Sequence, residues 1–105
     1  MRELTSKSEF DTLIGGDTYT LVMFTTVWSG PGKRIKPTFE KLAQQHDPDI
    51  AFATVDIEAA ADISQEVGIG ATPTFILFHQ GEKVRALVGA DPSALNDIVA
   101  TAKTA

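Results

Sequence analysis

The residues best suited to chemistry form one short segment, Val27 to Lys33, with the sequence Val-Trp-Ser-Gly-Pro-Gly-Lys. Glycine tolerates unusual backbone angles and proline suits the first turn of a helix, so the segment indicates a tight turn that opens a helix. Such a turn would point backbone N–H groups and the positive end of the helix dipole at Ser29. A cysteine in that place would have a lowered pKa and react as a thiolate. The chain contains no cysteine, which excludes disulfides, thiolate-bound metals and any cysteine-based redox cycle.

Ser29 itself has two interpretations. It could be the nucleophile of a hydrolase, because it follows an apolar run at a strand-to-helix junction. The flanking residues lack the Gly-x-Ser-x-Gly signature of that arrangement, and neither His46 nor His79 is expected near Ser29. A role as the N-cap of the helix is therefore favoured.

A second group of chemically competent residues is His46 with Asp47 and Asp49. These side chains could ligate a metal, but their spacing matches no common ligand template. The neighbouring Pro48 favours a solvated turn instead. We expect no metal site and no other cofactor.

The composition is that of one small globular domain over residues 1–105, with 43% apolar and 22% charged residues. A formal charge of −5 argues against binding to nucleic acid or to an anionic membrane, since both require a basic surface. The first seven residues are polar and show no apolar secretory core, so a cytoplasmic location is the expectation.

The elements that must position the Val27–Lys33 segment follow from hydrophobic periodicity. The residues over 19–26 favour a strand buried on both faces, in the middle of a sheet. The six phenylalanines are core candidates. The full prediction is a helix over 7–14, a strand over 19–26, a helix over 31–45 with Pro37 inside it, a strand over 50–57, a helix over 60–67, a hairpin of strands over 74–79 and 83–89, a final helix starting at Asp91 to Ser93, and an optional edge strand near Glu3 and Leu4. This order indicates an α/β fold with a central mixed sheet of four to five strands and helices on both faces.

Several separated motifs together resemble the thioredoxin family over essentially the whole chain. The segment Trp28-Ser29-Gly30-Pro31-Gly32-Lys33 resembles the family's Trp-Cys-Gly-Pro-Cys-Lys with both cysteines replaced. The other matching positions, in order and at similar spacing, are Pro37, Val55-Asp56, Thr72-Pro73-Thr74-Phe75, and Val88-Gly89-Ala90. The resemblance implies a thioredoxin fold.

The same resemblance implies where the family's chemistry would be. Its attacking cysteine, resolving cysteine and buried aspartate correspond to Ser29, Gly32 and Met23, and all three positions depart from the pattern. Serine forms no disulfide, glycine has no side chain to resolve one, and methionine carries no proton to transfer. Disulfide exchange of the family's kind is therefore impossible in this chain.

The family's peptide-binding groove is also implied, and it requires no thiol. In the family, the residue before a cis-proline pairs its backbone with an extended substrate segment. We expect a cis Thr72–Pro73 bond and a largely accessible Trp28. The residues that would form the groove here are Trp28, Gly30, Pro31, Ala71, Thr72, Pro73, Gly89 and Ala90.

Three functions stay open at this point. The leading hypothesis is a redox-inactive thioredoxin-like monomer that binds an extended protein segment noncovalently. The first alternative is an engineered or disabled variant of a thioredoxin protein-disulfide reductase. The second alternative is a structural or assembly subunit that uses the fold as a rigid block.

Overall fold

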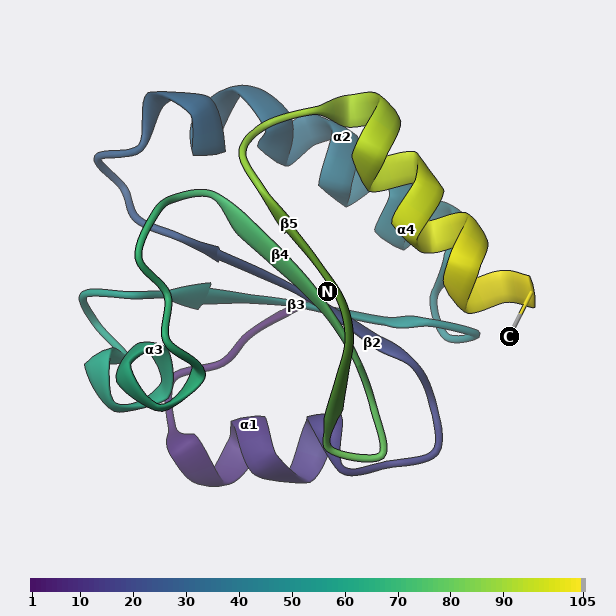
Figure 1. Ribbon diagram of the computed structural model, residues 1–105, viewed down its shortest axis with the longest axis horizontal. Helices are drawn as coiled ribbons and strands as arrows, with labels where there is room; N and C mark the ends of the chain where they lie inside the picture. Colours follow the sequence, from purple (N-terminus) through teal and green to yellow (C-terminus); the bar gives the residue numbers. More distant parts are fainter. Residues whose placement is uncertain (105) are drawn as a thin grey trace.

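A five-stranded sheet forms the centre of the computed structural model, which describes residues 1–104 (Figure 1). The elements in chain order are β1 (Arg2–Glu3), α1 (Lys7–Ile14), β2 (Thr20–Thr25), α2 (Gly30–His46), β3 (Ala51–Asp56), α3 (Ala61–Val67), β4 (Thr74–His79), β5 (Glu82–Val88) and α4 (Pro92–Thr104). The strand order is β1-β3-β2-β4-β5, with β1, β3 and β2 parallel and the β4–β5 hairpin antiparallel. The predicted mixed sheet is confirmed, with the optional edge strand present as β1.

Two hydrophobic layers enclose the sheet because successive side chains of a strand point to opposite faces. Met23 of β2 packs in the layer beneath α2 and α4, whereas Phe24 packs in the layer that contains residues of α1 and α3. Figure 1 shows α2 and α4 on one side of the sheet and α1 and α3 on the other. All the phenylalanines are buried, as predicted: Phe10, Phe24, Phe39, Phe52, Phe75 and Phe78.

The helices begin and end at residues that satisfy their free backbone groups. Ser6 caps α1, and Gly68 ends α3 in the left-handed conformation at φ 84°. Helix α2 continues through Pro37 to His46, and the predicted bounds of the elements differ from the observed ones by one residue or so at either end. None of the helices within residues 1–104 combines the length and the apolar character needed to cross a membrane.

The register of β4 determines which loops meet. Thr74, the first residue of β4, pairs with Phe24 of β2 and with Val88 of β5. The chain leaving β2, the chain entering β4 and the chain leaving β5 therefore lie at the same end of the sheet. Those three segments contain all of the positions predicted to form a groove.

Candidate functional site

Ser29 is the N-cap of α2, which confirms the interpretation favoured from the sequence. The residue is 7% exposed, and its Oγ accepts a hydrogen bond from the backbone N–H of Gly32 at 2.9 Å. Its carbonyl oxygen also accepts the first helical hydrogen bond, from the N–H of Lys33 at 3.0 Å. The hydroxyl is thus committed to holding the first turn of the helix.

No histidine is placed to activate Ser29. His46 is at the opposite end of α2, roughly 25 Å away at the rise of an α-helix. His79 is at the far end of β4 from Thr74, where its ring stacks on Tyr19 with the ring centroids 4.1 Å apart. The hydrolase interpretation is therefore wrong, because it requires a histidine beside Ser29.

Within residues 1–104, no three potential metal ligands converge, and the group around His46 forms no cluster.

Gly32 is buried, and the side chain of Thr25 occupies the space that a side chain at position 32 would need. A Cβ atom built on Gly32 would lie 2.2 Å from Oγ1 of Thr25 and 2.9 Å from Oγ of Ser29. Real Cβ atoms essentially never approach another heavy atom so closely. The position that corresponds to the family's resolving cysteine is consequently closed by a neighbouring hydroxyl.

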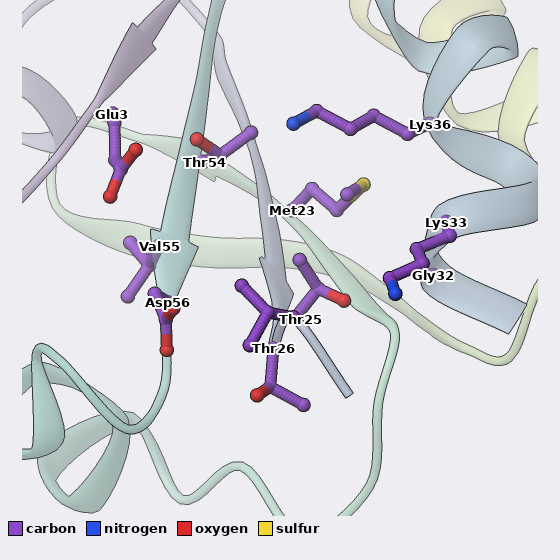
Figure 2. A pocket seen from close by; sticks show the side chains of 11 residues that line it. Glu3, Met23, Thr25, Thr26, Gly32, Lys33, Lys36, Thr54, Val55 and Asp56 are labelled. Atoms are coloured by element: carbon purple, nitrogen blue, oxygen red, sulfur yellow. The ribbon is translucent and has the colours of Figure 1, made fainter. Parts of the chain in front are cut away.

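Met23 lies fully buried in β2, at the position implied for a buried acid. It borders a cavity of about 250 Å³ at the end of the sheet, shown with its lining side chains in Figure 2. An uncharged side chain here avoids the cost of burying a carboxylate.

The outer surface of the same end of the sheet is apolar. Trp28 is 79% exposed, and Val27 and Val88 are 60% and 66% exposed. Gly30 and Pro31 are also exposed, in the first turn of α2. The expected accessibility of Trp28 is confirmed, and Val27 and Val88 extend the apolar surface beyond the residues predicted from the sequence.

The loop before β4 presents backbone groups at this surface. The Thr72–Pro73 bond is cis, as predicted. Pro73 is buried, Thr72 is partly exposed and Ala71 is exposed. The carbonyl of Ala71 accepts a hydrogen bond from Oγ1 of Thr74 at 2.7 Å, which holds the loop in place. Within residues 1–104, neither the N–H nor the C=O of Thr72 has a hydrogen-bond partner. Thr72 thus offers a free donor and a free acceptor.

The segment after β5 completes the surface. Gly89 has φ 107°, a conformation that glycine adopts without strain, and its N–H donates to the carbonyl of Pro73 at 2.9 Å. Ala90 packs partly against the core beneath α2 and α4. The loop before β4 and the segment after β5 are therefore joined directly. We call this end of the sheet the Trp28 surface, and we define it by ten residues: Val27, Trp28, Gly30, Pro31, Ala71, Thr72, Pro73, Val88, Gly89 and Ala90.

Some features of this end of the sheet were not predicted from the sequence. The contact between Thr25 and Gly32 and the cavity beside Met23 join residues from different elements. The alternation of side chains along the ends of two neighbouring parallel strands was the available signal, since Met23, Thr25, Thr54 and Asp56 share one face. A second cis bond, Asp47–Pro48, was not predicted either.

Comparison with known proteins gives a consistent result. The family model described as Thioredoxin matches residues 2–102. The chain is 42% identical to the thioredoxin of Malassezia sympodialis over 93 residues, covering 88% of this chain and 89% of that protein. It is 37% identical to thioredoxin-2 of Saccharomyces cerevisiae over 100 residues, covering 94% and 95% of the two chains. A relative named as mitochondrial, thioredoxin-2 of Schizosaccharomyces pombe, is 37% identical over 95 residues, covering 90% of this chain and 71% of that one.

Solved structures agree with the sequence relatives. The crystal structure of the Malassezia sympodialis thioredoxin superimposes with a TM-score of 0.93 at 37% identity, covering 96% of this chain and 89% of that one. The thioredoxin of Plasmodium falciparum superimposes with a TM-score of 0.92 at 31% identity, covering 96% and 98%.

Proposed function

The chain belongs to the thioredoxin family, and we propose that this cysteine-free member binds an extended protein segment noncovalently at the Trp28 surface. Without cysteine the chain cannot perform thiol–disulfide exchange. The bound segment would add to the loop before β4 in the manner of an extra strand, through main-chain hydrogen bonds.

The observation that carries this proposal is the pair of free backbone groups on Thr72. Exposed backbone groups of a loop usually bond to water. Here, other contacts already hold the loop around Thr72 in one conformation. The carbonyls on either side, those of Ala71 and Pro73, are both occupied by hydrogen bonds from Thr74 and Gly89. Thr72 is thus a preorganised donor and acceptor, so binding would cost little ordering of the loop.

The exposed apolar residues at the same end of the sheet as Thr72 supply the second contribution to binding. Trp28 is 79% exposed although a tryptophan side chain is among the most favourable to bury. Together with Val27 and Val88 it would cover apolar side chains of the bound segment. Exposed aromatic residues surrounded by smaller contacts are typical of interaction hot spots.

Trp28 also makes the proposal measurable because it is the chain's only tryptophan. The probe is a cysteine-free peptide of alternating apolar and serine residues, with added lysines to complement the chain's charge of −5. We expect a saturable change in Trp28 fluorescence when the peptide is added. The same peptide with N-methyl groups on its backbone should bind much more weakly, because strand addition needs its N–H groups.

Calorimetry on variants distinguishes specific binding at the Trp28 surface from non-specific binding elsewhere on the protein. Trp28→Ala should weaken peptide binding, whereas Val84→Ala should leave it unchanged. Val84 is a fair control because it is exposed at 42% but is near the other end of β5. Equal binding by the N-methylated peptide, or no saturable binding by either peptide, would show that the proposal is wrong.

A further inference from the structure

The cavity beside Met23 lies where the sheet topology favours a ligand site. It is bordered by the last residues of the neighbouring parallel strands β2 and β3, by β1 and by the first turns of α2. The chain leaves β2 into α2 and leaves β3 into α3, and those helices cover opposite faces of the sheet (Figure 1). Neighbouring parallel strands whose connections diverge in this way form a crevice at their carboxyl ends, and such crevices commonly hold ligands.

The register places the lining side chains in two rows across the sheet. Glu3 pairs with Thr54, and Thr54 pairs in turn with Met23, so the first row runs from a charged edge to the apolar core. The second row consists of Thr25 and Asp56. The strand side of the cavity is therefore lined by methionine, threonine and carboxylate side chains.

Two of these hydroxyls have unused hydrogen-bonding capacity. Oγ1 of Thr25 and Oγ1 of Thr26 are buried, and within residues 1–104 neither has a hydrogen-bond partner. Both residues line the cavity. Both oxygens are closed to a water-sized molecule, so they belong to the packed wall of the cavity and not to its open surface.

The charges around the cavity are separated by sign. Lys33 and Lys36 line it from α2, whereas Glu3 and Asp56 line it from the strands, as Figure 2 shows. Within residues 1–104, none of these four side chains forms an ion pair. Asp56 uses only Oδ1, which accepts from the N–H groups of Glu58 and Ala59. A simple anion or cation would meet like charge on one wall, while a ligand with both charges would find a partner on each.

We propose that this cavity binds a small zwitterion of the α-amino acid class, independently of the Trp28 surface. The ligand carboxylate faces the ammonium groups of Lys33 and Lys36, and the ligand ammonium faces Glu3 and Asp56. The volume of about 250 Å³ fits this size class. It is below the roughly 300–1,000 Å³ of sites for drug-sized ligands.

The direct test is an NMR titration of the full chain with L-alanine, sodium acetate and methylammonium chloride at equal ionic strength. L-alanine should shift the Met23 methyl and the Thr25 and Thr54 methyl signals in a saturable manner, with acetate and methylammonium at least about tenfold weaker. Acetate binding as tightly as alanine would show an anion site and overturn the proposal. If alanine at a concentration about fiftyfold above a millimolar Kd caused no saturable shift, the proposal would be overturned too, and only water would occupy the cavity.

Charge-neutralising variants test the two walls separately. Lys36 and Glu3 are both exposed, so Lys36→Gln and Glu3→Gln should each weaken alanine binding about two- to fivefold, within the usual range for an exposed ion pair. Lys41→Gln is the matched control, because Lys41 is an exposed lysine of the same helix that does not line the cavity. Trp28→Ala should bind alanine as the parent chain does. Equal affinity in Lys36→Gln, Glu3→Gln and Lys41→Gln would contradict the proposal, with circular dichroism confirming that each variant is folded.

Discussion

The hydroxyl oxygen of Thr25 lies where a side chain at position 32 would begin, 2.2 Å from a Cβ atom built on Gly32. The Thr25 side chain can adopt this position only because residue 32 is a glycine and has no side chain. The loss of the resolving cysteine is a feature of the packing as well as of the sequence. A cysteine could return to position 32 only if Thr25 moved or became smaller.

Relative to Gly30→Ala, Gly32→Ala should lower the free energy of unfolding by about 1–3 kcal/mol, the usual cost of overpacking a buried site. Both variants share the gain of about 1 kcal/mol in helix propensity that alanine brings, so this gain cancels in the comparison. The double variant Thr25→Ala with Gly32→Ala should recover much of the loss, which urea denaturation would measure. Gly30→Ala is the control, because among the described residues a Cβ there meets nothing within 4 Å. Equal stabilities of Gly32→Ala and Gly30→Ala would disprove the steric explanation.

Restoring both cysteines tests whether the scaffold could be a disabled reductase. We expect Ser29→Cys with Gly32→Cys to fold poorly and to reduce insulin disulfides weakly, for the steric reason given above. Adding Thr25→Ala should raise that activity by making room for the second sulfur. If no combination recovers activity, even with Met23→Asp added, the hypothesis of an active parent scaffold fails.

Ser29→Ala should lower the free energy of unfolding by about 0.5–2 kcal/mol, the range for loss of an N-cap. The reason is that the N–H of Gly32 would lose its acceptor in a buried place. Ser8→Ala, an exposed serine within α1, serves as the control and should change stability by less than about 0.5 kcal/mol. Thermal and urea denaturation would measure both, and equal effects would contradict the capping role.

Glu9 should make the stability of the fold dependent on acid pH. Hydrogen bonds from the Thr5 side chain, and then from the Thr5 backbone and Ser6, lower the pKa of Glu9 below its ordinary value of 4.5. A carboxyl with a lowered folded pKa stabilises the fold above its unfolded pKa, and this contribution is lost as pH falls through the folded value. Glu9→Gln should therefore be less stable than the parent at pH 7, with the difference disappearing in acid. A difference that grew on acidification would contradict this assignment.

The fold could be predicted from local patterns because they agree with one another. The apolar run of β2 predicted a central strand, and the six phenylalanines were predicted to be core residues, which their burial confirms. Ser29 as a cap and the cis Thr72–Pro73 bond were also foreseen, the first from its place before a helix and the second from family resemblance.

Contacts across elements could not be predicted in the same way. The Thr25–Gly32 contact depends on how sharply the chain turns between β2 and α2, which no periodicity encodes. The cavity requires the register of three strands and the position of a helix above them. The cis Asp47–Pro48 bond was not predicted. Only about 5–6% of X–Pro bonds in folded proteins are cis, so a trans bond is the default expectation.

We proposed that the free backbone groups of Thr72 receive an extended segment, and an NMR titration with the alternating apolar–serine peptide observes those groups themselves. We expect the amide signals of Thr72 and Gly89 and the indole signal of Trp28 to shift together and saturate, and the N-methylated peptide to leave them in place. Shifts confined to residues outside the Trp28 surface, or no shift at the Thr72 amide, would show that no segment pairs with Thr72.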